Sequence, residues 1–244
     1  MNEQLIAGLE EYLRELRVDL YGFADIAGIF GGEWKDWPHA ISMALELPID
    51  DVLGVQDGPT PRYYEAYVRT NARLNQIAAK VEAWIRRQGY RAQAVVATVA
   101  SEGLDQEFGP PLTAPVQHKT VATRAGLGWI GKNALLITRK YGPRVRLTSV
   151  FTDMPLPAAT PIEYGQCGKC ERCRDACPAQ AITGDMWLVG VAREALVDVE
   201  ACRQRAEQLL MERVGQQQAV CGVCVAVCPF SGRPAGRTET SADG

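Results

Sequence analysis

No cysteine occurs in the first 166 of the 244 residues, yet eight lie between positions 167 and 228. This absence excludes disulfides and thiolate metal sites from the first two thirds of the chain. The sequence also contains no run of 18 apolar residues, which excludes a membrane-spanning helix. Neither sign of charge is in large excess, because 26 Lys and Arg face 29 Asp and Glu. A net charge of −3 therefore gives no strong general attraction to nucleic acid or to an anionic membrane.

Export signals are missing as well. The first residues have no basic segment followed by an apolar stretch, and the only adjacent arginines, Arg86 and Arg87, lie deep inside the chain. We therefore expect a cytoplasmic protein without a membrane partner. With 47% hydrophobic residues the chain has enough apolar surface to fold. In reducing cytosol, closely spaced cysteines indicate a metal site or catalysis more often than disulfides.

The position of the cysteines predicts three segments. Residues 1–163 form an α/β domain without thiols, and residues 164–230 form a cysteine-rich domain. Residues 231–244 are small and polar, which predicts a disordered tail.

Hydrophobic periodicity predicts alternating helices and strands in the first domain. Helices are expected at residues 2–17 and from Tyr63 to a C-terminal Gly89, and strands at residues 21–26, 40–47 and 92–100. Residues 134–139 and 144–151 flank a Tyr-Gly-Pro turn and are expected to pair as a hairpin. In the second domain, Asp198 is expected to cap a helix that ends near Val214. The predicted fold class is α+β, or mixed α/β, followed by a metal-cluster domain.

Two cysteine motifs dominate the second domain. The first is Cys167-x2-Cys170-x2-Cys173-x3-Cys177-Pro178, and the second is Cys221-x2-Cys224-x3-Cys228-Pro229. The first has the spacing of bacterial ferredoxins, in which three thiolates of one loop bind three corners of a [4Fe–4S] cubane and the fourth binds the other cluster. The spacing therefore predicts two such clusters.

The second motif lacks a first cysteine, and Cys202 is the one thiol left to complete eight ligands. We assign one cluster to Cys167, Cys170, Cys173 and Cys228. The other cluster is assigned to Cys177, Cys202, Cys221 and Cys224.

Other interpretations of these cysteines remain open from the sequence alone. Paired C-x2-C motifs also bind structural zinc, although zinc rarely requires the x2-x2-x3-Pro pattern. Disulfides are disfavoured by a reducing compartment. Cys202 itself could be a small buried apolar residue instead of a ligand.

A glycine-rich segment, Ala-Gly-Leu-Gly-Trp-Ile-Gly-Lys-Asn, occupies residues 125–133. It satisfies both the dinucleotide fingerprint and the P-loop pattern, but each needs a strand before it and a helix after it. Here residues 116–124 look helical or irregular and residues 134–138 look like a strand, so the order is reversed. Two interpretations remain: a loop where backbone approaches a flat or anionic ligand, or a helix C-cap followed by a tight turn around a buried Trp129.

The glycine segment and the cysteine layout together resemble the epoxyqueuosine reductases and the related reductive dehalogenases. The resemblance covers most of residues 1–230, including residues 21–24 and 150–156. It implies a corrinoid-binding domain related to the nitroreductase-like flavin fold, joined to a two-cluster ferredoxin-like domain. It also implies cobalamin as a third redox group beside the two [4Fe–4S] clusters. By analogy, the residues near that cofactor would be Gly126, Gly128, Trp129, Gly131, Lys132 and Asn133.

The chain departs from the family in two respects. The family's catalytic aspartate, its proton donor, is replaced by Leu112, which carries no proton to donate. Many tRNA-acting members have extra C-terminal helical repeats, which we do not expect in this chain, and the net charge gives little support for binding tRNA. His118 is the candidate replacement acid, with Asp105 and Glu107 as further candidates.

Two hypotheses of function follow. In the first, the protein is an oxidoreductase that takes electrons from a low-potential donor such as ferredoxin or flavodoxin. It passes them through two clusters to a corrinoid, and a small or nucleoside-like substrate is reduced. In the second, it is a ferredoxin-like electron-transfer protein without substrate chemistry of its own. The missing acid favours the second hypothesis, whereas a companion domain of about 160 residues favours the first.

Overall fold

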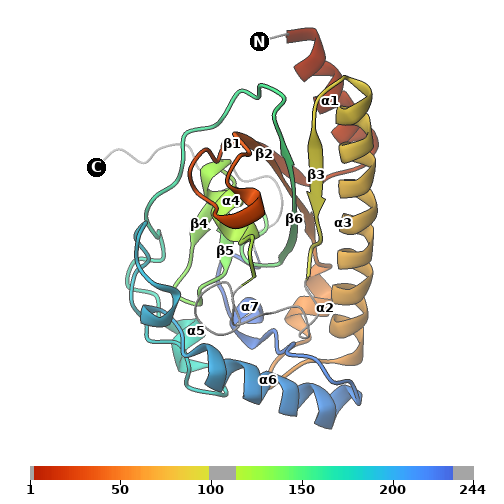
Figure 1. Ribbon diagram of the computed structural model, residues 1–244. Coiled ribbons are helices and arrows are strands. Elements are labelled where there is room, and N and C mark those ends of the chain that lie inside the picture. Colours follow the sequence, from red (N-terminus) through yellow and green to blue (C-terminus); the bar gives the residue numbers. More distant parts are fainter. Residues whose placement is uncertain (1–2, 99–113, 233–244) are drawn as a thin grey trace, which may run out of the picture.

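The computed structural model describes residues 3–98 and 114–232 (Figure 1). Its helices are α1 (Glu3–Glu15), α2 (Ile49–Leu53), α3 (Pro61–Arg87), α4 (His118–Arg124), α5 (Arg172–Asp175), α6 (Val199–Val214) and α7 (Val223–Ala226). Its strands are β1 (Leu20–Asp25), β2 (His39–Glu46), β3 (Ala92–Val95), β4 (Gly128–Ile130), β5 (Leu136–Thr138) and β6 (Val145–Thr152). Short 3-10 turns occur at Gly32–Trp34 and Arg193–Ala195. This mixture of helices and antiparallel strands confirms the predicted α+β class.

A four-stranded antiparallel sheet in the order β1-β2-β6-β3 forms the centre of the first domain. The long helix α3 packs along this sheet, and α1 lies beside the end of α3 (Figure 1). Side chains from both helices and from the sheet form one apolar cluster that includes Leu9, Leu13, Ile41, Leu74 and Val150. None of the helices within residues 3–98 and 114–232 combines the length and apolarity needed to cross a bilayer.

Local signals set the ends of the two longest helices. Thr60 caps α3 by accepting a hydrogen bond from the Tyr63 amide at 3.2 Å, and Pro61 follows at the first helical position. Asp198 caps α6 in the same way by accepting from the Ala201 amide at 3.0 Å. The Asp198 cap confirms the predicted start of α6, which ends at Val214 as expected. Helix α3 starts two residues before the predicted Tyr63 and ends two residues before Gly89.

The predicted hairpin around Gly142 is wrong. Thr138 and Gly142 exchange backbone hydrogen bonds of 3.0 and 2.9 Å, so the turn itself forms. The chain then diverges: β5 pairs with β4, whereas β6 inserts between β2 and β3 of the other sheet. Pairing along the full length of β2 gives β6 a longer ladder than a hairpin with the three-residue β5 would give. The predicted strand at residues 92–100 is likewise shorter, since β3 ends at Val95 and residues 99–100 lie outside the described part.

The cysteine-rich segment packs closely against the first domain. Helix α6 runs below the start of α3 (Figure 1). Two of the apolar clusters contain residues from both segments, such as Tyr63 with Leu210 and Ala44 with Leu196. Ser231, which the sequence assigns to the tail, is fully buried. The rest of the predicted tail, residues 233–244, lies outside the described residues.

Arg144 joins the two segments through buried contacts. Its guanidinium pairs with Glu46 at 2.6 Å and donates to the carbonyl oxygens of Leu47 and Ser231 at 3.1 and 2.9 Å. Only 5% of the Arg144 side chain is exposed, whereas 41% of Glu46 is. The strength of this junction thus comes from the buried cation and its carbonyl partners.

We expect Arg144→Gln to lower the free energy of unfolding by about 2 kcal/mol, because buried acceptors lose a charged donor. Urea unfolding under anoxic conditions measures the change. Arg139→Gln, at an exposed neighbouring position, serves as the control and should leave stability within about 0.5 kcal/mol. Equal stability of the two variants would contradict the junction.

Candidate functional site

Four cysteines from distant parts of the chain line one small cavity. Cys167, Cys170 and Cys173 come from the loop before and within α5, and Cys228 follows α7. The remaining lining residues are Lys132, Asn133, Ile137, Pro229 and Phe230. The cavity therefore brings together the four thiols that the sequence assigns to one cluster.

The other four thiols form a second group. Cys202 is exposed and not the buried apolar residue that the sequence left open. Partial desolvation of its thiol nevertheless raises its pKa, and the neighbouring thiolates of Cys177 and Cys221 raise it further. Cys224 is buried against Cys221, Cys202, Cys173 and Cys177, and its pKa lies well above that of a free thiol for the same two reasons. Such mutual repulsion stabilises the protonated thiols until a cationic metal centre binds and removes the protons. The chemistry of both groups fits [4Fe–4S] clusters.

The spacing of these thiols does not suit a single ion. Within residues 3–98 and 114–232, no three Cys, His, Asp or Glu side chains are placed to hold one metal ion. A structural zinc needs its ligands about 2.3 Å from one centre, whereas a cubane separates its four thiolates at four iron corners. The x2-x2-x3-Pro spacing of the cysteines, which zinc rarely requires, favours a cluster over zinc.

The glycine segment lies beside the first cluster group rather than in a larger cavity. A Cβ at Gly128 would collide with the carbonyl oxygen of Ile137, and one at Gly131 would lie 2.7 Å from the Ile137 side chain. These two glycines thus allow β4 and β5 to approach each other. Gly126 has a φ of +70° in the turn after α4, as a helix C-cap requires.

The other three predicted cofactor residues, Trp129, Lys132 and Asn133, are also buried close to the first cysteine group. Trp129 is buried and contacts Phe230 edge-on, with 5.2 Å between ring centroids. Lys132 and Asn133 are buried and line the cavity of the first cysteine group. None of the six residues lines either of the two larger cavities described below. The positions of these residues favour the interpretation as a helix C-cap followed by a turn. Lys132 and Asn133 lie next to the first cysteine group and not in a cavity for a corrinoid.

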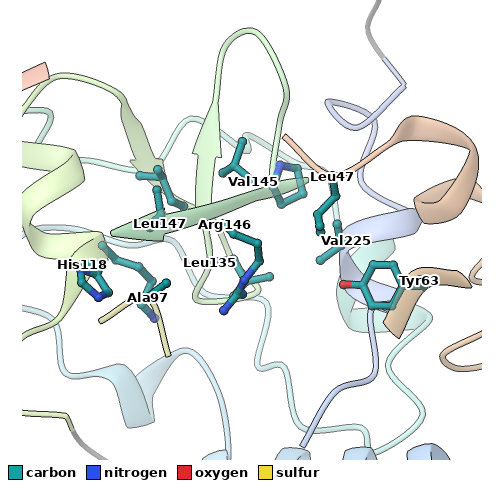
Figure 2. A pocket seen from close by; sticks show the side chains of 12 residues that line it. Leu47, Tyr63, Ala97, His118, Leu135, Val145, Arg146, Leu147 and Val225 are labelled. Carbon is teal, nitrogen blue, oxygen red and sulfur yellow. The ribbon is translucent and has the colours of Figure 1, made fainter. Parts of the chain in front are cut away.

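A larger cavity of about 260 Å³ lies beside the second cysteine group (Figure 2). Leu47, Leu135, Leu147 and Val225 contribute apolar walls, and Tyr63, His118, Lys119 and Arg146 contribute polar groups. Tyr63 is in contact with the loop of the second group, because a Cβ at Gly222 would lie 2.6 Å from its ring. Burial, together with the charges of Cys224 and Cys221, raises the Tyr63 pKa, although nearby Arg146 opposes the shift. The cavity thus adjoins the loop that carries two ligands of the second cluster.

A second cavity of about 330 Å³ lies on the other side of Lys119. The Lys119 ammonium donates to the Ala134 carbonyl oxygen at 2.6 Å, and burial lowers its pKa to about 8. Lys119 lines both cavities and therefore forms the partition between them.

His118 lies in the cavity but has no free ring nitrogen. Its Nε2 donates to the Val96 carbonyl oxygen at 2.8 Å, which leaves Nδ1 to accept from the Ser149 hydroxyl at 2.9 Å. Burial lowers its pKa to about 4, so the ring is neutral near pH 7. These bonds favour a role in positioning the cavity wall over the predicted role as a proton donor. Leu112, Asp105 and Glu107 lie outside the described residues.

The neutral state of His118 has a measurable consequence for stability. Its pKa falls from about 6.5 when unfolded to about 4 when folded, so lowering the pH protonates the unfolded chain first. Between pH 7.5 and 5.5 the wild type should lose about 1.3 kcal/mol more of its unfolding free energy than His118→Gln. Anoxic urea unfolding at both pH values measures this difference. Parallel losses in the two proteins would contradict a depressed pKa.

Sequence reasoning missed Tyr63, Lys119 and Arg146 as cavity residues. The sequence analysis treated Tyr63 only as part of the apolar face of a helix. Arg146 is the one charged residue of its strand. The charge of Arg146 between Val145 and Leu147 was the one local signal, because an arginine seldom occupies a central strand without a partner or a ligand.

Comparisons with known proteins support the cluster assignment. A family model described as a 4Fe-4S double cluster binding domain matches residues 166–231. The epoxyqueuosine reductase of Pseudomonas aeruginosa is 34% identical over 205 residues, which cover 83% of this chain and 51% of that protein. A tetrachloroethene reductive dehalogenase of Desulfitobacterium hafniense is 30% identical over 226 residues, covering 88% of this chain and 37% of that protein. The predicted resemblance and the double [4Fe–4S] domain are thereby confirmed.

Solved structures show the same fold. A catabolic reductive dehalogenase in complex with 3-bromo-4-hydroxybenzoic acid aligns with a TM-score of 0.70 at 20% identity, over 93% of this chain and 32% of that one. The epoxyqueuosine reductase of Bacillus subtilis aligns with a TM-score of 0.62 at 19% identity, over 96% of this chain and 67% of that one. The chain spans about half the length, or less, of the first two curated relatives named above.

Proposed function

Since the chain is a homologue of the epoxyqueuosine reductases and the reductive dehalogenases, we propose that it is an iron–sulfur reductase whose reaction takes place in the 260 Å³ cavity. The observation that carries the proposal is the contact between this cavity and the second cysteine group. Tyr63 and Val225 line the cavity, and both also pack around the loop of Cys221 and Cys224. A substrate in the cavity would therefore lie next to a redox centre.

We assign the eight cysteines to two [4Fe–4S] clusters with the ligand sets given above. When bound, the clusters carry electrons one at a time, and a corrinoid such as cobalamin would supply a cobalt centre that reacts with the substrate. The protein's own contribution is to exclude water with the apolar walls and to position polar groups at one side of the cavity. Besides the permanently charged Arg146, Lys119 and the Tyr63 hydroxyl are the groups of this cavity that carry a proton at pH 7.

The fit of a corrinoid is partial. The apolar walls suit the faces of a macrocycle, and one B12-dependent reductive dehalogenase is among the solved structures with this fold. A cavity of about 260 Å³, however, is below the range of about 300–1,000 Å³ that drug-sized ligands occupy, and a corrinoid is larger than these ligands. The described residues thus leave room for part of a corrinoid. This limited volume favours the second candidate function, an electron-transfer protein without substrate chemistry.

An electron donor would approach the first cysteine group. Cys228 and Pro229 border an open groove together with Leu53 and Arg172. This groove and the reaction cavity share no lining residue in the described part of the chain, so electrons entering here would pass from the first cluster to the second. The groove has an exposed cation, Arg172, beside the exposed Asp175. Arg172 would face the acidic surface of a low-potential donor such as ferredoxin or flavodoxin. A small or nucleoside-like substrate matches the cavity better than a whole tRNA.

The first test is anoxic purification, iron analysis and EPR with added cob(II)alamin. About eight irons per chain would support two cubanes. A base-off cobalt signal that appears on binding would support the corrinoid reductase. Clusters without any change in the cobalt signal would instead favour the electron carrier.

A further inference from the structure

We infer that Arg146 makes the 260 Å³ cavity a binding site for a small organic carboxylate with an apolar body. As a statement about the substrate, the inference rests on the proposed reductase function. As a statement about binding, it depends only on the cavity, which the chain's own residues form.

Arg146 is held rigidly by neutral groups. Its Nε donates to Asn71 at 2.9 Å, and one terminal nitrogen donates to the hydroxyls of Tyr67 and Thr98 at 3.3 and 3.1 Å. The guanidinium also lies over the Tyr67 ring, 4.3 Å from its centroid. These contacts fix the side chain but leave its positive charge without a counter-ion.

Arg146 is half-buried, yet within the described residues it lacks the carboxylate partner that the buried Arg144 has. Arg144, two residues earlier, pairs with Glu46, and Arg91 and Arg203 also have carboxylate partners. No carboxylate of residues 3–98 or 114–232 pairs with Arg146. Its second terminal nitrogen has no hydrogen-bond partner in the same part of the chain, although this nitrogen is not sealed from solvent. Two donor hydrogens therefore remain for a ligand.

The surroundings select the ligand. Figure 2 shows the guanidinium in the cavity, between the His118 ring and the Tyr63 hydroxyl. Its charge acts on both groups, because it lowers the pKa of each. Neither neighbour offers a carboxylate: His118 is an imidazole with both ring nitrogens bonded to Ser149 and Val96, and Tyr63 is a phenol.

One cation in an apolar cavity matches one negative charge on an apolar molecule. The volume corresponds to roughly nine water molecules, which is enough for a single ring with a carboxylate. Arginine recognises a planar carboxylate through directed, charge-assisted hydrogen bonds. A phosphate would carry a second negative charge, which needs a second cation. The other cation lining the cavity is Lys119, and its ammonium already donates to the Ala134 carbonyl oxygen.

The test is anoxic calorimetric titration of the cluster-loaded protein with sodium benzoate and with neutral benzamide of the same shape. We expect benzoate to bind at least tenfold more tightly than benzamide. Arg146→Gln should weaken benzoate binding by about tenfold to a hundredfold and leave benzamide binding unchanged. Arg87→Gln, at an exposed site near the far end of α3, should bind both as the wild type does.

Three results would overturn the inference: no benzoate binding to the wild type, equal binding of benzamide, or unchanged benzoate binding by Arg146→Gln. If Arg146→Gln loses iron or cooperative unfolding, Arg146→Lys decides, because it retains the charge without the planar fork. This variant should bind benzoate several-fold more weakly than the wild type, and unchanged affinity would overturn the inference. The cobalt EPR experiment is separate from this titration. If it shows that no corrinoid binds, the proposed corrinoid reductase is rejected, but the benzoate result still stands.

Discussion

Replacing Cys202 by alanine is expected to lower the iron content of the anoxically purified protein from about eight to about four atoms per chain. Cys202 lies in the first turns of α6, where the charges of Cys177 and Cys221 act on its thiol. Alanine removes the fourth ligand of that group and leaves the first cysteine group intact. EPR of the reduced protein should then show one cluster where the wild type shows two interacting ones.

The matched control is Met211→Ala, which truncates an exposed side chain of the same helix. It should retain about eight irons. If Cys202→Ala also retains them, Cys202 is a small apolar residue and not a ligand. Zinc in place of iron in either protein would contradict both cluster assignments.

Gly128→Ala is expected to lower the unfolding free energy by about 3 kcal/mol or more, which corresponds to a fall in Tm of roughly 10 °C. The new Cβ would lie 2.8 Å from the carbonyl carbon of Ile137 and 3.1 Å from the Cα of Thr138. These are backbone atoms, so no side-chain rotation can relieve the collision. Strand β4 must therefore separate from β5. Thermal unfolding followed by circular dichroism under anoxic conditions measures the effect.

Gly31→Ala is the control for this experiment. Gly31 has an ordinary φ of −103°, and a Cβ there would meet no atom within 4 Å. Its stability should change by less than about 0.5 kcal/mol. If Gly128→Ala instead keeps the wild-type Tm and only fails to bind cobalamin, the glycine is required for a cofactor, as the family resemblance implied.

The sequence was most informative where a feature depends on neighbours in the chain. The cap at Asp198 and the spacing from Cys167 to Cys177 could be predicted because each involves residues a few positions apart. The partner of β6 could not, since β2 lies about a hundred residues earlier and competes with the adjacent β5. Local turn chemistry alone favoured the adjacent strand.

The same difference between local and distant contacts holds for the candidate site. Tyr63 and Arg146 lie over eighty residues apart, and only the packing of α3 on β6 brings both to one cavity. Neither belongs to a motif. The glycine segment matched the letters of two motifs but not their strand and helix order, so a ligand loop and a C-cap with a turn both remained open. The structure explains Gly128 and Gly131 by the contact with β5, and Gly126 by the end of α4. A glycine in a sequence indicates that another group lies close to the backbone, but it does not show whether that group is a ligand or a neighbouring strand.

The interleaved cysteines also affect how the chain is made. The first cluster cavity combines Cys173 with Cys228, and the second group combines Cys177 with Cys224, so each site spans over forty residues. During synthesis neither ligand set is complete until nearly the whole described chain has left the ribosome. A cluster inserted at that point links two distant segments as a covalent staple would, and it removes loop-closure entropy from the unfolded state. Cluster insertion and the docking of α7 against α2 and α5 would then be one late, cooperative folding event.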